Sequence, residues 1–307
     1  MNRYFFFSDD HIWTFRSLAK ARPKSLFDNA YLRFMRSLHE KYDMKIQLNV
    51  FYSTHPSHGG PEFTLSEMPD IYKPEFIENS CWLRLAFHAY SEFPQFPYIN
   101  VRYDKMKSDF DILTSEIIRF AGEETLSHQF VPHYLPVSSE GVKALYDCGI
   151  DCVGCSYGFD APEEAEKELD EISLQRLNDG RYEDTSRAYY KNTSGGVLQL
   201  TLRGYNHIPQ DEAEKYEYTK LFYVDKKTGM KYKRLAHVVL NLHTPEEIKR
   251  IITPMLGSEF IGIGNHEQYF YPFYRNYEPD YRIRVETAIR MMHENGYESA
   301  FVDEINK

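Results

Sequence analysis

The sequence predicts an α/β fold in which about seven strands alternate with helices around one parallel sheet or barrel. Short apolar and aromatic runs recur along the chain, and segments with the four-residue apolar spacing of an amphipathic helix separate them. Several of these runs end in an acid or a histidine, at the edge where parallel α/β folds bind ligands. With 307 residues, 42% of them hydrophobic, the chain can form one large core, so we expect a single barrel domain over residues 1–307 with residues 159–234 inserted into it.

The first predicted strand, residues 4–11, reads YFFFSDDH and is the centre of the prediction. Three consecutive phenylalanines favour a buried strand, and Asp9 and Asp10 follow at its C-terminal edge. Adjacent carboxylates repel each other, and a cation or a shared proton would relieve that repulsion. The alternative is that one aspartate caps the next helix. The histidines that end later strands favour a functional site.

The remaining elements alternate in order. We expect helix within residues 12–42, a strand at 44–53, a loop at 54–70, a short helix at 74–79, a strand within 82–94, a helix at 103–121, a strand at 128–136, a helix that begins at Ser138 or Ser139, and a strand at 152–157. After the insertion, a strand at 237–243, a helix at 244–255, a strand within 259–270 that ends at His266, a helix at 281–295 that Gly296 ends, and a short strand at 299–305 complete the fold.

The predicted insertion, residues 159–234, breaks this rhythm with an acidic run, a strand at 197–205 and a hairpin at 220–234 whose turn is KKTG. We interpret it as an antiparallel excursion that forms a lid or an interface element, the latter in a homo-oligomer.

Composition excludes several classes of function. The net charge of −10 argues against a nucleic-acid partner. No run approaches the ~18 apolar residues of a membrane helix, and the N-terminus lacks the pattern of a signal peptide, so we expect a soluble, cytoplasmic protein without a membrane partner. Three of the four cysteines crowd into CGIDCVGC, where buried, reduced thiols are favoured over a zinc site that has no fourth ligand.

The predicted strand ends converge on one rim if all the strands are parallel. They are Asp9, Asp10, Tyr52, His88, His133, Tyr157, His243 and His266. A divalent metal binds such a mixture of imidazoles and carboxylates and keeps a position open for water or substrate.

At these residues the chain resembles the polysaccharide deacetylase family, whose domain is called the NodB homology domain. The segment FSDD, residues 7–10, resembles the family's TFDDG motif, which implies that Asp9 is the general base and Asp10 a metal ligand. The family's next motif has two histidines four residues apart. Here His88 matches the first, and Glu92 stands in place of the second, so the resemblance implies the ligand set Asp10, His88 and Glu92, with zinc as the first choice.

Later segments extend the resemblance. VPHYLP, residues 131–136, resembles the family's RPPYG motif and places His133 and Tyr134 among the substrate-binding residues. His266 matches the family's general acid, with Glu267 and Tyr269 beside it as further substrate-binding residues; a carboxylate at Glu267 would raise the pKa of His266. The resemblance implies a distorted (β/α)7-type barrel of the glycoside hydrolase and deacetylase kind, and metal-dependent removal of an acyl group from an N- or O-acylated carbohydrate.

Two alternatives stay open. The first is a non-catalytic or repurposed carbohydrate-binding homologue. The second is a glycosidase or C–N hydrolase on the same barrel, in which Asp9 or Asp10 would work with a second carboxylate, from Glu67, Glu267 or Asp303.

Overall fold

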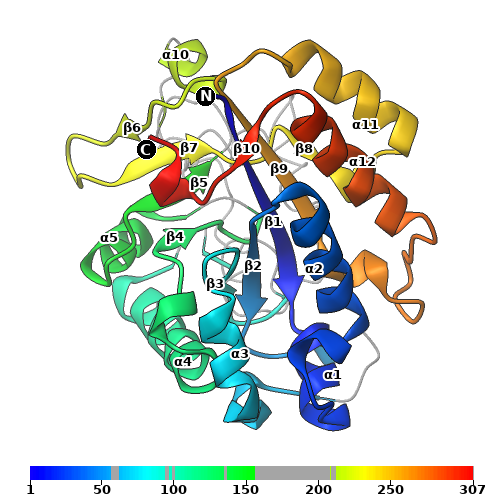
Figure 1. Cartoon of the computed structure of the whole chain (residues 1–307). Helices are drawn as coiled ribbons and strands as arrows, with labels where there is room; N and C mark the ends of the chain where they lie inside the picture. Colours follow the sequence, from blue (N-terminus) through cyan, green and yellow to red (C-terminus); the bar gives the residue numbers. More distant parts are fainter. Residues whose placement is uncertain are drawn as a thin grey trace.

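A computed structural model describes residues 1–56, 62–93, 97–98, 101–134, 137–155, 208 and 212–306 (Figure 1). The predicted strand at 197–205, the acidic run before it and Tyr157 lie outside these residues. Among the described helices, none has both the length and the apolar character that a bilayer span needs.

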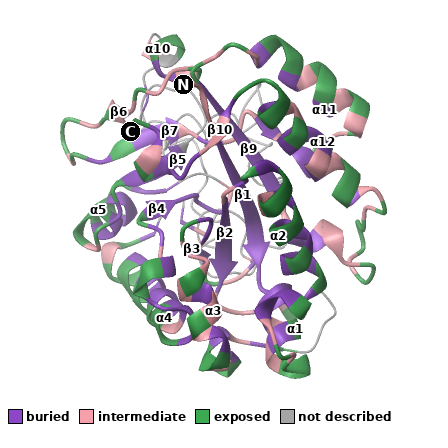
Figure 2. Cartoon of the chain, viewed as in Figure 1, coloured by how far each residue is buried: buried purple, intermediate pink, exposed green. Residues whose placement is uncertain are grey.

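The larger sheet is parallel and has β1 at its centre. Its order is β3 (Leu83–Ala89), β2 (Ile46–Phe51), β1 (Arg3–His11), β9 (Phe260–His266) and β8 (Val238–Val239), and β10 (Glu298–Ser299) also pairs with β1. The phenylalanine run of β1 is buried on both faces of this sheet, as the sequence predicts (Figure 2).

The smaller sheet consists of β4 (Gln129–Phe130), β5 (Cys152–Cys155), β7 (Lys231–Arg234) and β6 (Tyr223–Val224). Strands β6 and β7 are antiparallel, and Gly229 takes a φ of 77° in the turn between them, so the predicted hairpin is confirmed. Strand β7 also pairs in parallel with β5, so the described end of the predicted insertion is joined to the sheet.

Two junctions close these sheets into one barrel. Leu85 and Leu126 form a parallel bridge between β3 and the segment that leads into β4. At the other junction, β7 pairs with β5 and β8 pairs with β9. The segment that joins β7 to β8 passes close to Gly262, where a Cβ atom would lie 2.0 Å from the Leu235 carbonyl oxygen. The barrel positions are thus β1, β2, β3, β4, β5, β7 with β8, and β9, which confirms the predicted distorted (β/α)7 barrel.

Helices cover the outside of the barrel (Figure 1). They are α1 (Trp13–Ala21), α2 (Ala30–Tyr42), α3 (Lys73–Glu78), α4 (Tyr103–Ala121), α5 (Ser139–Asp147), α10 (Ala213–Glu217), α11 (Pro245–Ile252) and α12 (Tyr281–Glu294). Single 3-10 turns are η1 (Leu26–Asp28), η3 (Leu65–Glu67), η4 (Asp70–Tyr72), η5 (Glu123–Thr125), η7 (Leu240–Leu242), η8 (Thr253–Met255), η9 (Glu267–Phe270) and η10 (Val302–Glu304). Thr244 caps α11 and Gly296 follows α12 at a φ of 74°, as predicted.

Two predicted strands are shorter than expected because 3-10 turns replace their C-terminal parts. Strand β8 gives way to η7 and β10 to η10, so the predicted strands at 237–243 and 299–305 are corrected. Strand β9 ends at His266, as predicted, and η9 follows it. Apolar residues of η7 and η10 still pack inward, and that is why the sequence pattern did not distinguish them from strand. Below the cavity, Phe5, Phe7 and Leu235 pack with Phe301 and Ile305 in a small core of their own.

Candidate functional site

A cavity of about 400 Å³ opens at the C-terminal ends of the barrel strands. Asp9 and Asp10 from β1, His88 from β3, His133 from the loop after β4 and His266 from β9 all line it. The rim predicted from strand ends is therefore confirmed for these residues. Tyr52 and His243 are not among the residues that line the cavity; Tyr52 instead packs against Tyr90.

The end of β1 is distorted in a way that brings both aspartates into the cavity. Adjacent side chains of a regular strand point to opposite faces, so only one of Asp9 and Asp10 would face the barrel interior. Asp10, however, has a φ of 63°, and the register of β1 against β2 shifts between Ser8 and His11. This irregularity breaks the alternation, and a left-handed backbone at an aspartate is a strained conformation typical of functional sites.

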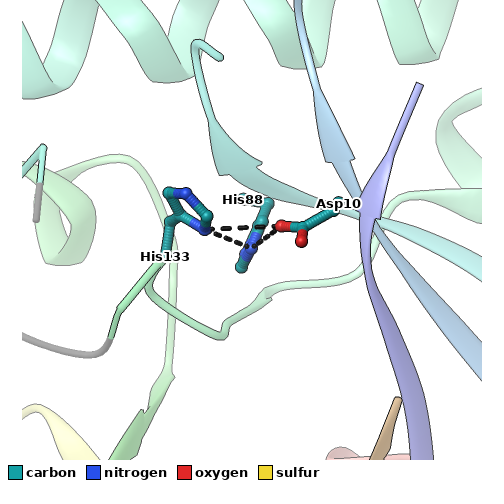
Figure 3. Close-up of side chains that lie close together, drawn as sticks. All are labelled: Asp10, His88 and His133. Carbon is teal, nitrogen blue, oxygen red and sulfur yellow. Dashed lines mark hydrogen bonds and ion pairs between the residues drawn. The ribbon is translucent and has the colours of Figure 1, made fainter. Parts of the chain in front are cut away.

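Three potential ligand atoms converge on one point of the cavity (Figure 3). His88 Nε2 lies 3.2 Å from Asp10 Oδ1, His133 Nδ1 lies 3.4 Å from the same oxygen, and the two nitrogens are 3.2 Å apart. Bonds of ~2.0–2.1 Å to a tetrahedral zinc ion place ligand atoms at ~3.3–3.4 Å from one another, so this spacing fits such an ion.

Backbone carbonyls set the tautomers of both histidines. His88 Nδ1 lies 2.7 Å from the Val131 carbonyl oxygen, and His133 Nε2 lies 3.0 Å from that of Glu92. A carbonyl only accepts, so these nitrogens carry protons, and the second nitrogen of each ring faces the shared point, where it offers a lone pair to a metal when it carries no proton of its own. Asp10 Oδ1 is buried there without a hydrogen-bond partner. Three converging lone pairs repel one another unless a cation lies between them, so Asp10, His88 and His133 fit a divalent metal.

The pKa values of the three side chains in this cluster shift in different directions. Burial lowers the pKa of His133 to about 3, which keeps that imidazole neutral and able to ligate. Burial would also lower the pKa of His88, but the negative charges of Asp9 and Asp10 outweigh it and raise the pKa. For Asp10, the surrounding imidazoles outweigh burial and lower the pKa, so this carboxylate is ionised.

Asp9 lies beside the cluster and is not one of its three members. Its Oδ1 accepts a hydrogen bond of 2.6 Å from Asn49 Nδ2 and lies 3.8 Å from His88 Nδ1. Burial raises the pKa of Asp9, a direction that suits a group that accepts a proton.

His266 faces Asp9 across the pair of strands β1 and β9, where the two residues are in register. Its Nδ1 lies 2.8 Å from Asn241 Oδ1, and its Nε2 lies 4.0 Å from Asp10 Oδ2. Asn241 is not among the predicted site residues; the available signal was its position as the polar break in the apolar run VVLNLH. Because the amide oxygen accepts from Nδ1, the Nε2 atom faces the cavity.

Glu92, predicted as a metal ligand, is not one of the three converging ligands. The chain after His88 bends and does not form a helical turn, so the expected spacing of one helical face is wrong. The group of three ligand atoms contains His133, which is predicted to bind substrate, and does not contain Glu92. Glu92 instead accepts a hydrogen bond of 2.7 Å from Gln268 Nε2, and burial raises its pKa to about 8.

Glu267 does not line the cavity, which corrects its prediction as a substrate-binding residue. Its buried carboxylate accepts hydrogen bonds from the backbone N–H groups of Ile12 at 2.8 Å, Trp13 at 3.0 Å and Thr14 at 2.6 Å. These amides form the start of α1, which has no side-chain cap of its own. Glu267 therefore ties the C-terminal end of β1 to the C-terminal end of β9. The residue that orients His266 is Asn241 and not Glu267.

Replacing Glu267 by glutamine is expected to lower the free energy of unfolding by about 1–3 kcal/mol, because an amide NH2 would face backbone donors in a buried place. Urea unfolding followed by circular dichroism measures this change. Glu259→Gln is the matched control, since Glu259 caps a single exposed N–H, that of Lys220. Equal stability of the two variants would contradict the role of Glu267 as a long-range cap.

Aromatic residues form one wall of the cavity. Tyr134 and Tyr269, both predicted to bind substrate, line it, as does Tyr274. The ring of Tyr134 lies against His133, with centroids 4.4 Å apart, and Tyr269 lies beside His266 at 6.1 Å. Such rings can stack on the apolar face of a sugar.

The other carboxylates considered for paired acid chemistry lie outside the cavity. Glu67 belongs to the capping box of η3 and pairs with Lys20 at 3.0 Å, and Asp303 pairs with Arg84 at 2.7 Å. Together with the buried cap formed by Glu267, these placements contradict a glycosidase that uses any of the three.

The comparisons with known proteins relate the fold to solved structures. The 4-α-glucanotransferase from Thermococcus litoralis matches the whole chain with a TM-score of 0.54 and 13% identity, and the chain spans 40% of that protein. Weaker matches include a polysaccharide deacetylase from Bacillus cereus, with a TM-score of 0.45, 12% identity and coverage of 98% of this chain and 92% of that one. A CE4 family pseudoenzyme from Bacillus anthracis has a TM-score of 0.43 and 8% identity, over 99% of this chain and 65% of that one.

No family model matches the chain, and no curated protein matches its sequence. At 13% identity, the likeness to the glucanotransferase establishes a shared fold alone.

Proposed function

We propose that the protein is a metal-dependent hydrolase of the polysaccharide-deacetylase type, which removes an acyl group from an N- or O-acylated carbohydrate. The observation that carries the proposal is the convergence of three lone pairs, from Asp10, His88 and His133, between Asp9 on one side and His266 on the other. The order of the corresponding motifs along the sequence supports the same proposal.

The chemistry requires three functions from the cavity. When bound by Asp10, His88 and His133, a divalent ion supplies Lewis-acid polarisation of the acyl carbonyl and a water of lowered pKa. Asp9 accepts the proton of the attacking water. His266, held by Asn241 with Nε2 toward Asp10, donates a proton to the departing amine or alcohol.

The cavity walls favour a sugar as the group that carries the acyl substituent. Tyr134, Tyr269 and Tyr274 offer rings for stacking, and a volume of about 400 Å³ holds a sugar unit with its acyl group. Glu92 and Gln268, joined by a hydrogen bond, present polar atoms to the same cavity and can bind sugar hydroxyls.

The proposal is tested with the zinc-loaded protein and a panel of N-acetylated and O-acetylated oligosaccharides, by measuring free acetate, free amine and new reducing ends. We expect acetate without new reducing ends. His266→Ala should lower turnover by about 10²-fold, at the low end for a general acid because the partly exposed side chain leaves solvent able to donate in its place. His243→Ala, a histidine outside the cavity, is the control. Turnover that survives His266→Ala would remove this residue from the mechanism.

A second candidate is hydrolysis of a glycosidic bond. The observation that favours it is the acid Glu92, whose pKa burial raises to about 8, in the same cavity as the ionised Asp10. In the assay above, new reducing ends without acetate would replace the first proposal by this one. Bound metal without turnover of any sugar would favour the carbohydrate-binding alternative.

A further inference from the structure

A chain of three hydrogen bonds between buried side chains leads to Asp9. Ser127 Oγ donates to Gln47 Oε1 at 2.7 Å, Gln47 Nε2 donates to Asn49 Oδ1 at 2.7 Å, and Asn49 Nδ2 donates to Asp9 Oδ1 at 2.6 Å. Gln47 and Asn49 are two residues apart on β2 and so share one face of that strand. We call Ser127, Gln47 and Asn49 the amide relay.

The amide relay is closed off from solvent and from the cavity. Gln47 and Asn49 are fully buried and Ser127 is 6% exposed. None of the three lines the cavity. The backbone of Ser127 is fixed as well, since its N–H donates to the Leu85 carbonyl oxygen at 2.8 Å beside the bridge that closes the barrel. The relay thus has a rigid far end and ends at the carboxylate of Asp9.

The chemistry of Asp9 sets the direction of every bond in the relay. An ionised carboxylate only accepts, so Asn49 must present its NH2 group to Asp9 and its oxygen to Gln47. Gln47 must then present its NH2 group to Asn49, which leaves its oxygen for a donor, and the Ser127 hydroxyl is that donor. One carboxylate oxygen of Asp9 is held in this way, and the relay makes no bond to the other.

We propose that Asn49 is a positioning residue for Asp9 and that Gln47 and Ser127 fix the orientation of its amide. Ser127 therefore acts on the reaction through two intervening side chains. The inference rests on the proposed function for its kinetic consequence, while the orientation of Asp9 can be measured without any substrate.

The kinetic test compares Asn49→Ala, Ser127→Ala and Ser127→Thr. Loss of Asn49 should lower kcat by about 10- to 100-fold with KM unchanged, because a misplaced base fails only at the chemical step. Ser127→Ala should lower kcat in the same way. Without the hydroxyl donor, the side-chain amide of Gln47 can flip, and that of Asn49 can then flip as well. Ser127→Thr keeps the hydroxyl and should restore kcat to within about threefold of the wild type.

Thr125→Ala is the matched control. Thr125 is a buried residue two positions before Ser127, and its hydroxyl donates to the Gly122 carbonyl oxygen at 2.6 Å, outside the relay. It should lower thermal stability and leave kcat unchanged. An equal loss of kcat in Thr125→Ala and Ser127→Ala, or no rescue by Ser127→Thr, would overturn the relay in favour of a general effect on stability.

Crystal structures of the wild type and Asn49→Ala provide the test that needs no activity. Asp9 should keep one side-chain orientation in the wild type and turn to another in the variant, while Asp10, His88 and His133 stay in place. An Asp9 that does not move would overturn the inference even if the wild type is active. A wild type without activity would refute the proposed function, and the same pair of structures would still decide the relay.

Discussion

Asp9→Asn is expected to lower the turnover of an acylated sugar by about 10²–10⁴-fold while the protein keeps its metal and its fold. Asparagine has nearly the shape of aspartate, and Asp9 is not one of the three candidate ligands, so the cluster should stay intact. The variant loses the ability to accept a proton, and its amide, if it turns its NH2 group to Asn49, also places donor against donor.

The measurement is kcat with saturating substrate, together with metal content and thermal unfolding of the same samples. Asp303→Asn is the control, because this aspartate pairs with Arg84 outside the cavity and was one of the alternative catalytic acids. Turnover of Asp9→Asn near the wild-type value, with metal bound, would contradict the assignment of Asp9 as the base.

His133→Ala is expected to weaken zinc binding by more than about 100-fold, since even residues that only support a metal ligand contribute 10- to 100-fold. Glu92→Gln should bind zinc as the wild type does, because its carboxylate is not one of the three converging ligands. The two variants separate the ligand set implied by the family motif from the set that the structure brings together.

Competition with a chromophoric chelator measures both affinities. The wild-type affinity should rise with pH, because zinc must displace the proton from His88, whose pKa the negative charges of Asp9 and Asp10 raise against the effect of burial. Loss of zinc in Glu92→Gln, with zinc retained in His133→Ala, would restore the ligand set Asp10, His88 and Glu92.

The sequence was sufficient for those features that depend on local pattern. The aromatic run of β1, the alternation of strands with amphipathic helices and the cap at Thr244 are each readable from neighbouring residues. The placement of Asp9, Asp10, His88 and His266 at one rim follows from their positions at the C-terminal ends of parallel strands. These features were enough to predict the barrel and the place of the cavity.

Other features depend on contacts between residues far apart in the sequence. The ligand role of His133 depends on carbonyl oxygens of Val131 and Glu92 that select the tautomers of two histidines. Glu267 caps a helix whose N-terminal end lies 255 positions earlier in the sequence. The residues around His266 do not indicate this contact. The positive φ of Asp10 is likewise a property of the closed barrel and not of the pair DD.

The most direct test of the proposed metal-dependent hydrolysis is acetate release by chelator-stripped protein as zinc is added back. We expect no release without metal and a rise that saturates at one zinc per chain, with His133→Ala inactive over the same range. Release that is already maximal in the stripped protein, or full zinc occupancy with no acetate released from any acylated sugar, would contradict the proposal.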